Sequence, residues 1–155
     1  SLSLPTERMT YRAAIRRLLL RSRQAADGHM NAIREAEPLT YALVRREITQ
    51  YVLDKFLLTG EDLAETDSFD GLTERSLAKS MQVSPELVKE FDTAQSCDGA
   101  TSAMAKKVLL FRSIERALEI EIPAMRSARL KSMEDFSEMI WDALGDSPRW
   151  KARMK

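Results

Sequence analysis

Apolar residues in this chain recur every three or four positions, which is the spacing of one face of an α-helix. The clearest stripe joins Leu43, Ile48, Val52 and Phe56. No segment of useful length alternates apolar and polar residues as a half-buried β-strand does. Five glycines and five prolines in 155 residues leave little material for hairpins. The sequence therefore predicts an all-α fold.

Start and stop signals divide the chain into helices. The predicted helices are a first from Thr6 to a C-cap at Gly28, a second that Pro38 opens and that ends near Phe56, a short pair at about 74–81 and 85–91, a long one from Ser102 to Leu118, a short piece from Pro123 and a last one that Ser132 caps. The acidic segment 57–72 and the polar segment 92–101 are predicted loops.

Within the long helix, helical spacing predicts that Met104, Val108, Phe111, Ile114 and Leu118 face the core. Near the end of the chain, Trp141 is a predicted core residue. Trp150 follows Pro148 in a basic segment, 148–155, and is predicted to be exposed.

The charges sum to zero but are unevenly placed. Residues 1–36 carry seven arginines against three acidic residues, whereas residues 61–98 carry ten acidic residues against three basic ones. The arginines of the first helix alternate with apolar residues at helical spacing, which favours a solvated basic face on a packed helix. Binding to a membrane surface, RNA or an acidic partner stays open as an alternative.

Several classes of function are disfavoured by composition. A single cysteine, Cys97, excludes an internal disulfide and fits a reducing, cytoplasmic compartment, and with His29 as the single histidine a zinc site or Cys-His pair is not expected. The apolar run from Leu18 to Leu20 is too short to span a membrane. Metal-ligand spacing, a phosphate-binding loop and a nucleophile motif are missing from the sequence, so we do not expect an enzyme.

Three stretches in order resemble the acyl carrier protein family, which binds phosphopantetheine. They are ITQYVLDKFLLTGEDLAETDSF (48–69), TSAMAKKVLLFRSIERALEIEIP (101–123) and LKSMEDFSEMIWDAL (130–144). The resemblance implies a four-helix carrier-like bundle over residues 38–147, with an insertion at about 72–97 that holds the short helix pair. The basic helix at 1–37 precedes this bundle, and the basic tail at 148–155 follows it.

The resemblance implies that Ser102 carries a covalent 4'-phosphopantetheine arm. With such an arm in place, we expect Lys106 and Lys107 to contact its phosphate or to meet an acidic surface of a transferase, and Met104, Val108 and Phe111 to line a cavity for the cargo. Independently, a serine at a helix start is a good N-cap, and the positive end of the helix dipole favours a phosphate there.

The implied function is to carry an acyl or aminoacyl group in lipid or secondary-metabolite biosynthesis. The implied partners are a phosphopantetheinyl transferase and the enzymes that load or process the acyl group. The family's usual Asp before the serine is Thr101 here, and the large apolar residue after it is Ala103. An unmodified carrier-like scaffold for protein–protein interaction therefore stays open.

A DNA-binding helix-turn-helix is a further alternative, carried by Leu77–Val88. Its second helix holds Glu86 and Glu90 against a single basic residue, Lys89. Because contacts with phosphate supply most of the affinity for DNA, this acidic face opposes binding, and we do not expect nucleic acid as a partner.

Overall fold

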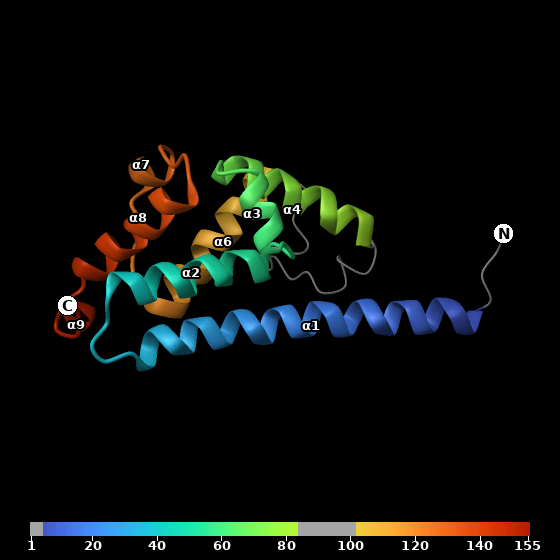
Figure 1. The fold of residues 1–155 in the computed structure, drawn as a ribbon, viewed down its shortest axis with the longest axis horizontal. Coiled ribbons are helices and arrows are strands. Elements are labelled where there is room, and N and C mark those ends of the chain that lie inside the picture. Colours follow the sequence, from blue (N-terminus) through green and yellow to red (C-terminus); the bar gives the residue numbers. More distant parts are fainter. Residues whose placement is uncertain (1–4, 84–101) are drawn as a thin grey trace.

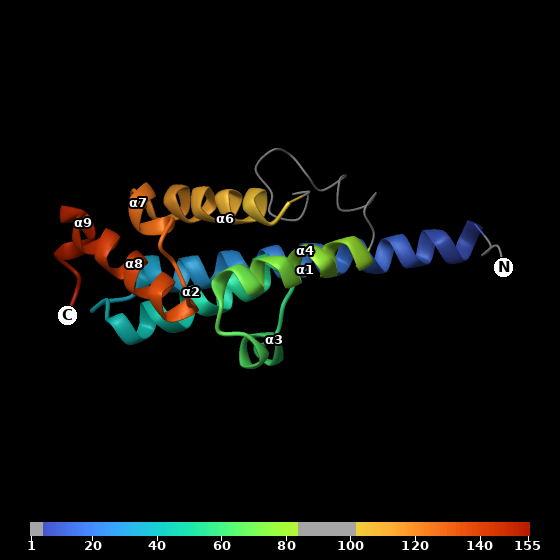
Figure 2. The same ribbon diagram turned by 90° about the horizontal axis from the view of Figure 1, so that it is seen from above.

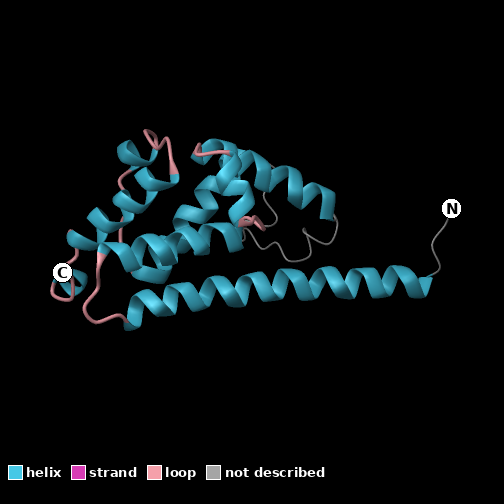
Figure 3. Ribbon diagram, in the orientation of Figure 1, coloured by secondary structure: helices cyan, strands magenta, loops and turns pink. Residues whose placement is uncertain are grey.

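A computed structural model describes the backbone of residues 5–83 and 102–155, with side chains from 10–82 and 102–155. Its helices are α1 (Pro5–Glu35), α2 (Tyr41–Lys55), α3 (Gly60–Glu65), α4 (Phe69–Val83), α6 (Ala103–Leu118), α7 (Ala124–Ser127), α8 (Met133–Gly145) and α9 (Pro148–Lys151). In the described part of the chain, β-pairing is limited to isolated β-bridges, and there is no strand (Figure 3). The prediction of an all-α protein is confirmed.

Helix α1 is the longest element and packs against α2 along its C-terminal half (Figure 1). Ala26, Met30 and Ile33 are buried there with apolar residues of α2. The prediction that Gly28 ends this helix is wrong, because α1 continues to Glu35. Packing on α2 outweighs the cost of a glycine inside a helix, about 1 kcal/mol.

The second helix begins later than predicted. Pro38 lies before it, and Thr40 is the N-cap whose side chain accepts a hydrogen bond from the Leu43 N–H at 3.3 Å. Residues 1–37 were expected to form a helix separate from the bundle, but the C-terminal half of α1 supplies part of the core.

The segment predicted as a loop at 57–72 contains α3 and the start of α4. Thr59 and Asp62 form a capping box that begins α3. The Ser68 hydroxyl accepts a hydrogen bond from the Gly71 N–H at 3.1 Å, at the first turn of α4. These local caps begin two helices in a stretch whose acidic, turn-rich composition indicates a loop.

Helix α4 packs on α6 and is longer than the predicted helix at 74–81. It buries Leu72, Thr73, Ser76 and Ser80, so this part of the predicted insertion belongs to the body of the protein. The second predicted helix, 85–91, lies outside the described residues. Viewed from above, α6 and α3 lie on opposite sides of the molecule (Figure 2).

The buried face of α6 differs from the predicted one. Lys106, Leu110, Ile114 and Leu118 are buried, whereas Met104 is 68% exposed and Val108 39% exposed. The buried residues follow a strict four-residue spacing, but its first position holds a lysine. Because lysine is a polar residue, the hydrophobic pattern of the sequence did not place position 106 in the core.

Four phenylalanines join α4, α6 and α8 to the end of α2. Phe69 stacks on Phe136 with ring centroids 4.8 Å apart, and Phe111 stacks on Phe136 at 5.6 Å. Phe56 lies 6.3 Å from Phe69. These ring contacts fix the position of α6, which carries the candidate site, relative to α4 and α8.

The basic segment 148–155 is docked on the body. Trp150 is 1% exposed, and its indole N–H donates to the Leu118 carbonyl at 2.8 Å. The Leu39 N–H donates to the Arg153 carbonyl at 2.7 Å, and the Lys155 N–H donates to the Leu39 carbonyl at 2.9 Å. The prediction that Trp150 is exposed is therefore wrong.

Candidate functional site at the start of helix α6

Ser102 lies at the exposed N-terminal end of α6. Its backbone is extended (φ −142°, ψ 155°), and its hydroxyl oxygen accepts a hydrogen bond from the Ala105 N–H at 3.1 Å. The Ser102 carbonyl accepts from the Lys106 N–H at 3.0 Å, which is the first bond of the helix. Ser102 is therefore an N-cap, as the sequence predicts.

The first turn of α6 contains no acidic residue. Its backbone N–H groups give the helix end a partial positive charge that favours an anion. A phosphodiester on the Ser102 hydroxyl would meet no repulsion from the helix itself.

Lys106 is placed away from solvent, in contrast to the contact with the phosphate that was expected for it. Its side chain is fully buried, and the ammonium donates to the Ser80 hydroxyl of α4 at 3.1 Å. The same ammonium lies 5.9 Å from the centroid of the Phe56 ring. A fully buried ammonium cannot contact a phosphate that lies in solvent at Ser102.

Lys107 also points toward α4. Its ammonium lies 3.1 Å from the Asp70 carboxylate and 5.9 Å from the centroid of the Phe69 ring. Lys106 and Lys107 thus hold α6 against α4 from two adjacent positions.

Among the described residues, Met104, Val108 and Phe111, which were assigned to a cargo cavity, do not line any of three surface hollows. Met104 and Val108 lie on the surface, while Phe111 is half-buried among the phenylalanines of the core. These hollows lie between α2, α3 and α8, beside α7 and α8, and around the segment that links α6 to α7.

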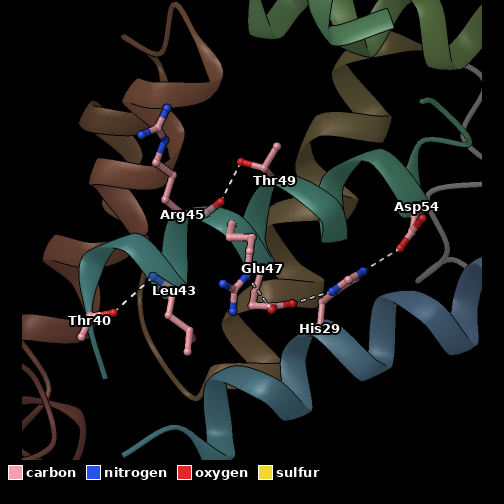
Figure 4. Close-up of polar contacts among 8 residues, drawn as sticks. His29, Thr40, Leu43, Arg45, Glu47, Thr49 and Asp54 are labelled. Carbon is pink, nitrogen blue, oxygen red and sulfur yellow. Dashed lines mark hydrogen bonds and ion pairs between the residues drawn. The ribbon is translucent and has the colours of Figure 1, made fainter. Parts of the chain in front are cut away.

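A histidine clasp, formed by His29 with two carboxylates of α2, was not found from the sequence (Figure 4). The His29 Nδ1 lies 2.6 Å from the Glu47 carboxylate, and its Nε2 lies 3.1 Å from that of Asp54. Glu47 and Asp54 are seven residues apart, two helical turns, so both face α1. Burial raises the pKa of Asp54, and the neighbouring His29 opposes that rise. The clasp joins α1 to α2.

A second polar group joins α2 to α8. The Tyr41 hydroxyl donates to the Glu134 carboxylate at 2.7 Å, and the Arg45 guanidinium lies 2.9 Å from the other oxygen of that carboxylate. Burial, the hydrogen bond to Glu134 and the nearby negative charges raise the pKa of Tyr41 to about 12. Arg45 and Glu134 of this group line the hollow between α2, α3 and α8, and the contacts join α2 to α8.

Among the residues that the structure describes, no group of three histidine, cysteine or carboxylate side chains could hold a metal ion. Within the same residues, no helix has the length and apolar character needed to cross a membrane. Thr101 and Cys97 lie outside the described residues.

Comparison with known proteins adds no relative: no family model, no curated protein and no solved structure matches this chain.

Proposed function

We propose that this chain is an acyl-carrier-like protein that carries an acyl or aminoacyl group on a phosphopantetheine arm attached to Ser102. The observation that carries the proposal is an exposed serine at the N-cap of a long helix, with an anion-favouring first turn. The order of helices supports it: the long α2 and α6, the short α7 and the Ser132-capped α8 follow the order that the resemblance implies.

Residues of α6 and its neighbours give the attachment point a rigid base. Leu110, Ile114 and Leu118 anchor the helix in the core, and Lys107 ties its first turns to Asp70 of α4. An arm on Ser102 would start from a fixed position, and its phosphate would lie next to the N–H groups of the first turn.

When bound, the phosphopantetheine arm supplies a terminal thiol that holds the cargo as a thioester. The protein itself positions the arm and presents it to a phosphopantetheinyl transferase and to the enzymes that load or process the acyl group. Since Met104 and Val108 are exposed on the first two turns of α6, they are available for apolar contact with such an enzyme or with the cargo.

The second candidate is an unmodified carrier-like scaffold that binds a protein partner. The burial of Lys106 favours it, because no lysine of the first two turns is available to the proposed phosphate. In this alternative the exposed Met104 and Val108 are contact residues only.

Intact-mass measurement after incubation with coenzyme A and a broad-specificity phosphopantetheinyl transferase separates the two candidates. We expect the wild-type protein to gain the mass of one arm and Ser102→Ala to gain none. Ser132→Ala is the matched control, because Ser132 caps α8 with the same geometry, accepting from the Asp135 N–H at 3.1 Å. This variant should be modified as the wild type is.

If the wild-type protein gains no mass with any of several transferases, the unmodified scaffold replaces the carrier. Gain of the arm by Ser102→Ala would show that a different residue is the attachment site.

A further inference from the structure

The outer face of helix α1 and its flanks carry exposed basic and apolar side chains. Arg17 and Arg21 are exposed one helical turn apart, and Leu18 and Leu20 are each 45% exposed beside them. Each arginine is two residues from the buried Leu19, a rotation of about 200°, so both lie on the opposite side of the helix.

This part of α1 extends beyond its helical partner. At 1.5 Å per residue, the 31 residues of α1 span about 46 Å, whereas the 15 residues of α2 span about 22 Å. Asp54, in the last turn of α2, contacts His29, and Arg21 and Arg17 lie about two and three helical turns before His29, so both arginines lie past the end of α2. In Figure 1 the N-terminal part of α1 continues beyond α2. Arg17 donates to the Ala13 carbonyl of its own helix, and Arg21 has no acidic partner among the described side chains.

A complementary acidic face lies on α3 and the first turns of α4. Residues 61–74 contain six carboxylates and no lysine or arginine. Arg75 and Lys107 pair with three of these carboxylates. Glu61, Asp67 and Glu74 are exposed and have no basic partner within the described part of the chain.

The basic face of a chain cannot reach its own acidic face. Helix α1 is continuous and is fixed by its C-terminal half, so its outer face points away from the body. The two faces can therefore meet only between copies.

We propose that the outer face of α1 (Arg17, Leu18, Leu20 and Arg21) binds the α3–α4 acidic face (Glu61, Asp67 and Glu74) of a second copy of this chain. The outer face of α1 is basic and the α3–α4 face is acidic, so one copy of the chain presents charges complementary to those of a second copy. A reciprocal arrangement makes the contact twice and closes a two-fold dimer, the commonest symmetry of soluble oligomers. Exposed leucines beside the arginines add apolar contact to the attraction between charges.

Sedimentation equilibrium of the full chain tests this dimer. At low ionic strength we expect the average mass to rise with concentration from the 17.6 kDa of one chain toward twice that value. High salt should lower it again, because exposed charges are screened. Arg17→Glu/Arg21→Glu should remain monomeric at every concentration.

Arg112→Glu/Arg116→Glu is the matched control, because these arginines are also exposed and one helical turn apart, on α6. The control changes the net charge equally and should associate as the wild type does. Circular dichroism verifies that each variant keeps its helices.

A charge exchange completes the test. Glu61→Lys/Glu74→Lys alone should be monomeric, because both of its faces are basic. Mixed with Arg17→Glu/Arg21→Glu, it should form a one-to-one dimer, because each α1 then meets a face of opposite charge. The proposal is overturned if the wild-type chain stays monomeric at low salt, if the α1 variant associates as the wild type does, or if the two complementary variants fail to associate.

Discussion

Replacement of Trp150 by alanine should be one of the most destabilising single changes in the described part of the chain. The side chain is 1% exposed, and its indole N–H is bonded to the Leu118 carbonyl at the end of α6. Truncating a buried tryptophan to alanine costs about 3–5 kcal/mol, and a buried carbonyl left without its donor costs about 1–3 kcal/mol. Allowing for overlap between these effects, we expect Trp150→Ala to lower the free energy of unfolding by about 4–6 kcal/mol.

Trp150→Phe keeps one aromatic ring but removes the indole N–H together with the smaller ring that carries it, so its cost should lie below that of Trp150→Ala. The lost donor contributes about 1–3 kcal/mol of this cost, and the lost ring adds a smaller packing loss. Urea denaturation followed by far-UV circular dichroism gives both values. Arg149→Ala is the matched control from the same short helix, because Arg149 is 61% exposed and pairs with the exposed Glu119. An exposed pair is worth about 0–1 kcal/mol. A cost below about 1 kcal/mol for Trp150→Ala would refute the docking of residues 148–155 on the body.

Three further outcomes follow from the polar contacts. Tyr41 should ionise near pH 12 in a spectrophotometric titration. Its raised pKa stabilises the folded state fully at pH values below the ordinary tyrosine pKa of 10.0, and this stabilisation should be lost as the pH rises toward 12. His29→Ala should cost about 1–3 kcal/mol in urea denaturation, because it leaves the half-buried Glu47 without its closest partner; no loss of stability would show that the clasp is not formed. Ser102→Ala should cost about 1 kcal/mol through loss of the N-cap, whereas Ser102→Asp should cost little, as thermal denaturation can verify.

Two helix starts set by neighbours in the sequence were predicted correctly, whereas the local caps that begin α3 and α4 were missed. Ser102 and Ser132 were expected as N-caps, and both accept hydrogen bonds from the N–H three residues ahead. A cap depends on a few consecutive residues, so its signal is contained in the local sequence.

Features set by distant residues were not predicted. Lys106 occupies a core position because α4 supplies a hydroxyl and α2 an aromatic ring for its ammonium, and neither neighbour is visible from α6 alone. Because Lys106 is on the buried face of α6, Met104 and Val108 lie on the exposed side of the helix. These two residues had been expected to line a cargo cavity. Similarly, the pairing of residues 153–155 with Leu39 buries Trp150, although the local composition of that segment indicates exposure.

The pairing of Leu39 with Arg153 and Lys155 has a consequence for the local dynamics of the protein. Both backbone groups of Leu39 are bonded to residues more than 110 positions away, so the turn between α1 and α2 and the segment after α8 protect each other. In hydrogen exchange, the amides of Leu39 and Lys155 should open as one cooperative unit, although they belong to opposite parts of the sequence. The turn between α1 and α2 is thereby held in place by residues that come after α9 in the sequence.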